Sequence, residues 1–334
     1  WFTQNKTSPN PENLKYFLFT NYTIYYSRLL GTPLPLPEYV PLERANKVAE
    51  WLALKKKQGT PAHLDTSASS GVRVCLAAKE QQLDIAGTIF RFGGEPYTQA
   101  KAQVVAETGS HAVCHYSMAE IGHIGIACAA PSYLDDVHLL KDKVAVIQRE
   151  KTLGLSKVKV GAFIHTTLFS APPKIMLNVE SDDYGVIIER SCGCPLDALG
   201  FHQHIHSIRS YEKLTSEGMN FIGSDLISLL EEVLPTSFGG NPTDYQFVEE
   251  ENDGLPKVSI IVSPRVGNVD ETKIINTVLQ ALRLYNGANK MMVDFWKKGD
   301  TLRVVRCEPY ATSVSKILPL HILKKNNLLK KIDS

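Results

Sequence analysis

The sequence predicts an α/β fold, in which an α/β layer is followed by a β-rich region and a compact α+β region. Three observations support this prediction. Apolar residues alternate between helical and extended spacing over 42–116, short β-rich runs fill 144–189, and strand and helix patterns alternate again over 257–306. Strands that alternate with helices are typical of parallel sheets covered by helices.

The α/β layer is expected in the following order. Residues 1–40, rich in proline and aromatic residues, predict an extended connector. Apolar residues at helical spacing predict a helix over 42–57. Ser and Thr at 66–70 predict the N-terminal cap of a helix over 72–82. Residues 87–92 predict a short buried strand that ends at a Gly-Gly turn.

A helix over 98–107 and a strand over 112–116 complete this layer. The later elements are predicted from shorter patterns. The expected later strands are 144–149, 158–164, 174–179, 185–189, 257–262 and 302–306, and the expected helices are 226–234 and 270–285.

Composition excludes several classes of protein. With 334 residues, 43% of them hydrophobic, the chain is long enough for two domains with hydrophobic cores. The net charge of +1 gives no reason to expect nucleic acid or an anionic membrane as a partner. No apolar run approaches the roughly 20 residues that span a bilayer, and no signal peptide is visible.

The cysteines also bear on the class of protein. Their number and spacing do not resemble a small secreted domain held by disulfides. We therefore expect a cytoplasmic protein whose cysteines are reduced or bound to metal. Because the chain starts at Trp1 and not at Met, we also expect that it is cut from something longer.

Four short stretches carry the residues that suggest chemistry. Gly93–Pro96 and Tyr116–Glu120 end successive predicted strands, Asp183–Gly185 lies in the β-rich region, and Arg209–Gly218 follows it. Each stretch alone has a structural explanation, because Gly-Gly and Asp-x-Gly are common turns and an aromatic residue at a strand end often belongs to the core. Their order and spacing indicate a functional site.

In this order the stretches resemble the adenylate-forming (AMP-binding) superfamily, and within it the phenylacetate–coenzyme A ligase-like branch, over roughly 42–319. That branch has a Gly-Ala-Glu-Pro turn at the border of its adenine pocket. Gly93–Pro96 matches this turn, with Gly94 in place of the Ala. The resemblance therefore implies that Gly94, Glu95 and Pro96 bind nucleotide.

The resemblance also implies a domain plan. Residues 1–208 are expected to be the rear part of the AMP-binding N-terminal domain, made of the α/β layer and a β-rich subdomain. Residues 209–213 are expected to be a hinge, and 214–334 a small α+β lid domain that rotates about it.

The family's Tyr-Gly-x-x-Glu motif matches Tyr116–Glu120, with Ser117 in place of Gly. By resemblance, Tyr116 packs on the adenine ring and Glu120 holds Mg²⁺ against the phosphates, which suits a hard oxygen ligand. Asp183 matches the Asp that binds the ribose hydroxyls. Asp182 is close enough to take this role instead, and both could be ordinary turn residues.

The hinge segment of the family has the sequence Arg-Ser-Asp-Asp, and the stretch that begins at Arg209 is similar to it. By resemblance, Arg209 contacts the ribose and the phosphate, and Ser210, Tyr211 and Glu212 form the hinge. Tyr211 and Glu212 replace the two family aspartates.

Near the C-terminal end, Thr312–Lys316 resembles the Thr-x-x-Gly-Lys segment that carries the adenylation lysine, with Ser315 in place of Gly. By resemblance, the ammonium group of Lys316 reaches the α-phosphate and stabilises the charge that develops there. The alternative is that Lys316 is an ordinary exposed lysine.

A second constellation comprises Cys128, His138, Cys192 and Cys194. The thiolates of a Cys-x-Cys pair can point at one ion, and three sulfurs with one imidazole complete a closed tetrahedral zinc site of the structural kind. The phenylacetate ligase-like branch has residues of these types in this order. The alternative is a set of buried free thiols and a surface histidine.

Other candidates are weaker. His202, His204 and His206 alternate and would share one face of a strand, but no carboxylate or cysteine accompanies them in the sequence. His123 follows Glu120 closely and could line an acid pocket. Cys75 and Cys114 are expected to be core residues.

The implied activity has two steps. A small carboxylic acid attacks the α-phosphate of MgATP, which gives an acyl-adenylate and pyrophosphate. After the lid rotates, a thiol takes the acyl group. Coenzyme A is the expected thiol, and a carrier-protein arm is the alternative. A homodimer is also possible on this resemblance.

The family's Ser/Thr/Gly-rich phosphate-binding loop has no match in this sequence, because Ser67–Gly71 falls where the family begins a helix beside the acid pocket. We therefore expect little adenylation by this chain alone. The second hypothesis is a zinc-stabilised, non-catalytic ligase-like domain that binds nucleotide or a protein partner. The substitutions at Ser117, Tyr211 and Ser315 favour it.

Overall fold

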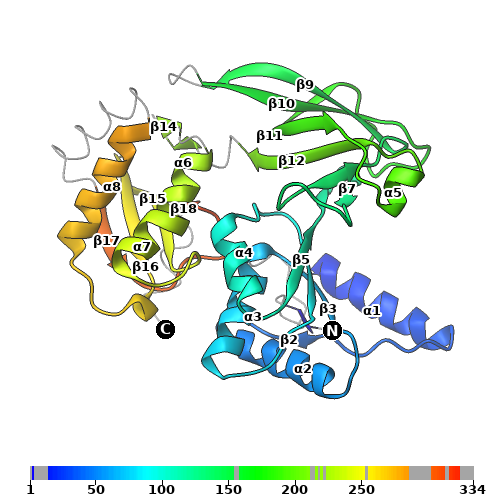
Figure 1. Ribbon diagram of the computed structural model, residues 1–334, viewed down its shortest axis with the longest axis horizontal. Coiled ribbons are helices and arrows are strands. Elements are labelled where there is room, and N and C mark those ends of the chain that lie inside the picture. Colours follow the sequence, from blue (N-terminus) through cyan, green and yellow to red (C-terminus); the bar gives the residue numbers. More distant parts are fainter. Residues whose placement is uncertain are drawn as a thin grey trace.

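The computed structural model describes residues 2–3, 14–153, 158–210, 215–216, 219–220, 223–252, 255–285, 302–312 and 316–323. It shows a mixed α/β protein, as the sequence predicts (Figure 1). The protein has two large hydrophobic cores. The first core contains residues between Val40 and Ile205, and the second contains residues between Leu226 and Leu320. Among the described helices, none combines the length and the apolar character that a membrane crossing requires.

The N-terminal segment contains a helix, α1 (Leu14–Leu29), so the expected extended connector over 1–40 is wrong in this part. The prolines at 33, 35 and 37 all follow the helix, where they disfavour helical backbone without interrupting it. Strand β1 (Phe2–Thr3) precedes this helix in the sequence, and β2 (Glu38–Tyr39) follows it. The two strands pair with each other.

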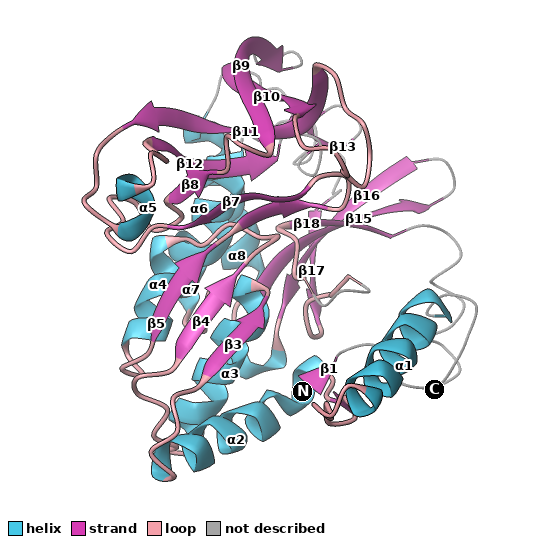
Figure 2. Ribbon diagram, turned by 90° about the vertical axis from the view of Figure 1, so that its right-hand side faces the viewer, coloured by secondary structure: helices cyan, strands magenta, loops and turns pink. Residues whose placement is uncertain are grey.

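The α/β layer is a three-stranded parallel sheet in the order β3-β4-β5, with helices packed against it (Figure 2). The side chain of Ser67 caps α3 and that of Thr98 caps α4, because each oxygen accepts from a backbone N–H of the first turn. The predicted helices of this layer are confirmed. The elements are η1 (Leu42–Arg44), α2 (Ala45–Lys57), β3 (His63–Thr66), α3 (Ala68–Glu80), β4 (Ile89–Phe92), α4 (Gln99–Ala106) and β5 (His111–Cys114).

A seven-stranded antiparallel sheet forms the β-rich region, in the order β6-β7-β8-β12-β11-β10-β9. Its register places His204 opposite His138 and Asp183 opposite Ser210. The expected strand over 174–179 is not present, since only Val179 belongs to a strand. The elements are β6 (Tyr116–Met118), β7 (Gly122–Ala127), β8 (Val137–Leu139), β9 (Val144–Leu153), β10 (Val158–Thr167), β11 (Val179–Glu189), α5 (Pro195–Ala198) and β12 (Gln203–Ser210).

The C-terminal region is an α+β unit with a four-stranded sheet in the order β17-β16-β15-β18. The helix expected over 226–234 consists of three consecutive helical segments. The first and the last are α-helical, and the middle one, η4, is π-helical. The elements are β13 (Thr215–Ser216), β14 (Met219–Asn220), α6 (Gly223–Ser228), η4 (Leu229–Val233), α7 (Leu234–Phe238), β15 (Tyr245–Asn252), β16 (Leu255–Val262), η5 (Pro264–Val266), α8 (Glu271–Tyr285), β17 (Leu302–Arg306) and β18 (Leu320–Leu323).

Candidate active site

A cavity of about 390 Å³ lies where the α/β layer, the seven-stranded sheet and the C-terminal region meet. Residues far apart in the sequence line it together. Of the residues expected to bind nucleotide, to catalyse or to form the hinge, those that line this cavity are Gly94, Glu95, Pro96, Tyr116, Glu120, Asp183, Arg209, Ser210 and Lys316. Tyr211 and Glu212, the other two expected hinge residues, lie outside the described residues.

The Lys316 side chain ends at the turn that carries Gly94. A Cβ atom built on Gly94 would lie 2.1 Å from Nζ of Lys316, and the φ angle of Gly94 is +75°. Glycine adopts this backbone region at no steric cost, and its missing side chain leaves the space that the ammonium group takes. The sequence could not show this contact, because the two residues belong to different regions of the chain.

The Tyr116 hydroxyl donates a hydrogen bond of 2.8 Å to Oδ2 of Asp183. Burial of Tyr116 raises its pKa far above the usual value, and the nearby charge of Asp183 raises it further. Tyr116 therefore stays protonated and keeps donating to the carboxylate. The neighbouring Asp182 accepts a hydrogen bond of 2.6 Å from the hydroxyl of Ser210. Both aspartates belong to strand β11, not to a turn, and both line the cavity.

Two other charged residues of the cavity have partners within the protein. Arg209 lies 3.3 Å from Oδ2 of Asp135. Glu120 lies 3.6 Å from Nζ of Lys174, and the Lys174 side chain is 67% exposed. An exposed pair of this kind contributes little free energy, so Glu120 can exchange Lys174 for another cation at low cost.

Glu95 lines the cavity and also binds within the protein. Its half-buried carboxylate accepts from the backbone N–H of Ser69 at 2.7 Å and from that of Ile317 at 2.9 Å. Burial raises the pKa of Glu95, and the charge of Lys101 opposes this shift. The carboxylate thus connects the first turn of α3 to the residue after Lys316.

Lys101 and Glu231 form a buried ion pair beside the cavity. Their side chains are 6% and 7% exposed, with 2.8 Å between Nζ and Oε1. Lys101 also donates to the carbonyl of Pro96, and the hydroxyl of Thr98 donates to Glu231. This pair joins α4 to the π-helical segment η4, and no local signal in the sequence indicates it.

The expected zinc ligands come together in the structure. Nε2 of His138 lies 3.1 Å from Sγ of Cys194 and 3.6 Å from Sγ of Cys192. Cys128 joins this group, because its ligand atom and those of His138 and Cys192 all lie within 4.8 Å of one another.

His204, a weak candidate from the sequence, joins the cluster. The four residues whose ligand atoms all lie within 4.8 Å of one another are Cys128, His138, Cys192 and His204, so Cys194, although it lies near His138, is not among them. The signal that could have found His204 is the pairing of β8 with β12, which sets it opposite His138.

Contacts around the cluster fit a metal. Nδ1 of His138 lies 2.7 Å from the carbonyl oxygen of Phe201, and Nδ1 of His204 lies 2.7 Å from Oδ1 of Asp136. Within the described part of the chain, Nε2 of His204 is buried and has no hydrogen-bond partner. Metal-binding histidines commonly have this arrangement, in which one ring nitrogen donates to an oxygen and the other faces the ion. The donor set of thiols and imidazoles suits zinc.

The thiols of the cluster differ in acidity. Burial raises the pKa of Cys128 to about 11. The pKa of Cys194 is lowered to about 6, because hydrogen bonds from the backbone of Asp197 and from Cys192 outweigh the opposing effect of burial. Cys194 is the N-cap residue of α5, where backbone N–H groups favour a thiolate.

Of the remaining residues, Cys114 lines the cavity, and His202 and His206 have other partners. His202 lies 2.5 Å from Asp197, and the ring of His206 stacks on Tyr133. His115 lines the cavity. The ring of His123 packs against the ring of His115, and His123 is not among the described residues that line the cavity. As expected, Cys75 and Cys114 are buried, and burial raises the pKa of each to about 12.

No protein-family model and no curated protein matches the sequence. Among solved structures, a 2-hydroxyisobutyryl-CoA ligase in complex with 2-HIB-AMP and CoA is 15% identical, with a TM-score of 0.44 over 92% of this chain and 63% of that one. A benzoate CoA ligase from Burkholderia xenovorans LB400 is 12% identical, with a TM-score of 0.46 over 86% and 55%.

An adenylation domain of a keto acid-selecting NRPS module, bound to a keto acyl adenylate, is 11% identical, with a TM-score of 0.36 over 81% of this chain and 54% of that one. The chain thus spans 54% to 63% of the length of the three proteins.

Proposed function

We propose that the chain is part of an adenylate-forming ligase, which activates a small carboxylic acid with ATP and passes the acyl group to a thiol. One observation carries the proposal. The nucleotide-binding, magnesium-binding and lysine residues that the sequence motifs predict, separated by more than 200 positions, line a single cavity.

The first step is a substitution at the α-phosphorus of ATP. A carboxylate oxygen of the acid forms the new bond, the α–β anhydride bond breaks, and pyrophosphate leaves. Lys316 stabilises the negative charge that builds up on the α-phosphate oxygens. Tyr116 offers its ring to the adenine, and the carboxylate of Asp183, oriented by the Tyr116 hydroxyl, accepts from the ribose.

Mg²⁺ is implied by this reaction, and Glu120 is the residue proposed to hold it. When bound there, the ion supplies charge neutralisation of the phosphates. The partner of Glu120, Lys174, is exposed and able to move away from the carboxylate.

For the second step we propose that coenzyme A accepts the acyl group, with a carrier-protein thiol as the alternative. We also propose the domain plan of 1–208, a hinge at 209–213, and a lid over 214–334. In the arrangement described, Lys316 faces the cavity, which corresponds to the adenylation half of the cycle.

Zinc is proposed to be structural. Cys128, His138, Cys192 and Cys194, with His204 as a competing donor, would hold it, and it would supply a closed crosslink. The crosslink would join the loop after β7 to the turn between β11 and β12, at the end of these strands opposite to Asp183 and Arg209.

Acid-dependent exchange of pyrophosphate into ATP tests the proposal on the full-length protein, with a panel of aromatic and aliphatic acids. Exchange that requires both an acid and Lys316 is the expected result. Its absence with every acid would reject the ligase activity.

The second candidate is a non-catalytic domain that binds nucleotide or a protein partner. It is favoured by one observation, namely that Glu120, Asp183 and Arg209 each have a partner inside the protein. Calorimetric binding of AMP or ATP without any pyrophosphate exchange would support this candidate over the ligase.

A further inference from the structure

We propose that one face of helix α3, which carries Ser69 and Arg73, acts with Glu95 to position Lys316 by holding the chain on both sides of it. The proposal rests on the proposed function for its catalytic consequence and on the contacts below for its geometry. Ser69, Arg73 and Glu95 are positioning residues on this view, since they hold the lysine-bearing segment and not the reacting atoms.

The first anchor lies directly after Lys316. The backbone N–H of Ile317 donates to Oε1 of Glu95 at 2.9 Å and lies 3.3 Å from Oγ of Ser69. The Ser69 hydroxyl donates to the same carboxylate at 2.6 Å. Glu95 also accepts from the backbone N–H of Ser69, which belongs to the first turn of α3 and has no partner within the helix. A negative charge is stabilised at this end of a helix.

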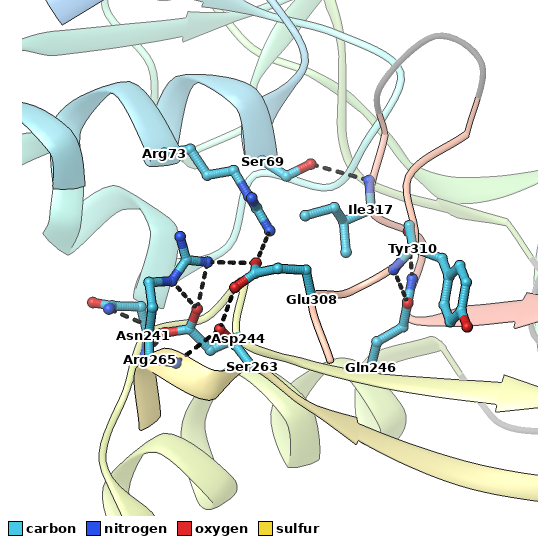
Figure 3. A network of polar contacts seen from close by, with 10 residues as sticks. All are labelled: Ser69, Arg73, Asn241, Asp244, Gln246, Ser263, Arg265, Glu308, Tyr310 and Ile317. Carbon is cyan, nitrogen blue, oxygen red and sulfur yellow. Dashed lines mark hydrogen bonds and ion pairs between the residues drawn. The ribbon is translucent and has the colours of Figure 1, made fainter. Parts of the chain in front are cut away.

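The second anchor lies before Lys316, at Glu308 (Figure 3). Its carboxylate accepts from the hydroxyl of Ser263 at 2.9 Å, from Arg265 at 3.1 Å, and from Arg73 at 3.4 Å. Arg265 also pairs with Asp244, which is fully buried.

Arg73 is the residue that links the second anchor to α3. Its side chain is 4% exposed, so its positive charge has lost most of its water. Burial lowers the pKa of Arg73, the positive charge of Arg265 lowers it further, and Glu308 opposes both effects. A buried cation needs a nearby carboxylate, and Glu308 is the anion that ion-pairs with it.

Gln246 binds the backbone on both sides of the Lys316 turn. Its buried amide donates to the carbonyl oxygens of Tyr310 at 2.9 Å and Leu318 at 2.8 Å, and it accepts from the backbone N–H of Tyr310 at 2.7 Å. The residues on either side of the Lys316 turn are therefore tied to each other as well as to α3.

The two anchors share one helix face because Ser69 and Arg73 are four residues apart. Figure 3 shows both side chains directed from α3 toward the C-terminal segment. Since Lys316 lies between the residues that they hold, a shift of α3 moves the lysine relative to Gly94. The helix face thus sets the position of the ammonium group in the cavity.

Hydrogen–deuterium exchange of the Ile317 amide tests the geometry without reference to activity. Glu95→Gln keeps the shape of the side chain but presents an amide to donors that need a carboxylate, and Arg73→Met removes the link between α3 and Glu308. Each variant is expected to speed exchange at Ile317 at least about tenfold, which corresponds to the ~1.4 kcal/mol of one hydrogen bond.

Lys79→Met is the matched control, because Lys79 lies on the same helix and its ion pair with Glu107 is exposed. It should leave the Ile317 amide as protected as in the wild type. Unchanged protection in both Glu95→Gln and Arg73→Met, with wild-type circular dichroism, would overturn the proposal.

Kinetics test the catalytic consequence separately. In pyrophosphate exchange, Arg73→Met should lower kcat about tenfold or more and leave KM for ATP close to wild type, and Arg73→Lys should restore part of the loss. Equal losses in kcat for Arg73→Met and Lys79→Met would count against positioning. A wild type with no exchange at all would reject the proposed function, while the amide protection would still decide whether α3 holds the segment.

Discussion

The ammonium group of Lys316 lies against the backbone of Gly94, where a Cβ atom would be 2.1 Å from Nζ. The turn that the sequence motif places beside the adenine therefore also borders the lysine. A group with a full positive charge that is held at one wall of a small cavity is pre-arranged to act on a substrate anion, because little reorganisation is needed when charge develops.

Replacement of Lys316 by Met should lower acid-dependent pyrophosphate exchange by about 10²–10³-fold, the usual cost of removing one group that stabilises transition-state charge. The affinity for ATP should change much less, which equilibrium calorimetry with AMP or ATP can measure. Activity within a few-fold of wild type would show that Lys316 is an ordinary surface lysine.

Gly94→Ala should displace the lysine without unfolding the protein. The new methyl group competes with Nζ for the same space, and a side chain at a φ of +75° adds strain of about 1 kcal/mol. Gly59→Ala is the matched control, with a φ of +68° and nothing within 4 Å of its Cβ. Both variants should lose similar thermal stability, and only Gly94→Ala should lose exchange activity. Equal activities would show that the contact is unimportant.

The buried pair of Lys101 and Glu231 gives a stability prediction. Lys101→Met leaves a carboxylate that is 7% exposed without its cation, so unfolding free energy should fall by roughly 3–5 kcal/mol. The exposed pair of Lys159 and Glu150 has the same 2.8 Å separation, and Lys159→Met should cost far less. Adding Glu231→Met to Lys101→Met should recover most of the loss in urea denaturation. If the double variant does not recover stability, the loss in Lys101→Met does not come from the unpaired carboxylate of Glu231.

His165 predicts a loss of stability in mild acid. Burial lowers its pKa from 6.5 to about 4, so the unfolded chain binds a proton that the folded chain refuses between these pH values. The free energy of unfolding should therefore fall as the pH drops from 6.5 toward 4, and this residue should account for up to roughly 3 kcal/mol of the loss. His165→Phe should flatten that part of the curve, and replacement of the exposed His63 by Gln should not.

Zinc content tests the metal cluster. The purified protein should carry about one zinc ion per chain by elemental analysis, and Cys128→Ser or Cys192→Ser should remove most of it. Cys75→Ala alters a buried thiol elsewhere and should leave the content unchanged. His204→Gln and Cys194→Ser then show which of the two completes the ligand set. Full zinc in both Cys128→Ser and Cys192→Ser would reject the site.

The sequence predicts those elements in which local signals agree. Helix α3 has both a serine cap and apolar residues at helical spacing, and the structure confirms it. Strand β15 was not predicted, because it is buried on both faces yet carries Gln246, Glu249 and Glu250, which hide its apolar pattern. Gln246 and Glu250 find partners on other segments, and that compensation is invisible in a local window.

For the candidate site, the sequence predicts which residues line it but not the contacts between them. Family-like motifs identified residues that line one cavity, Glu95 among them, but they gave no sign that its carboxylate binds Ser69 and Ile317. They also missed Arg73. Such contacts depend on how separate regions dock, and no spacing within one region encodes them.

The spans that the Lys316 anchors bridge have a consequence for folding. Ile317 bonds to Glu95 across 222 positions, and Arg73 pairs with Glu308 across 235. Closing loops of this size costs chain entropy before any contact repays it, so such contacts form after the local ones. We expect both cores to be compact before the lysine reaches its place, and a chain nicked between them to lose the arrangement at Lys316 while each core stays folded.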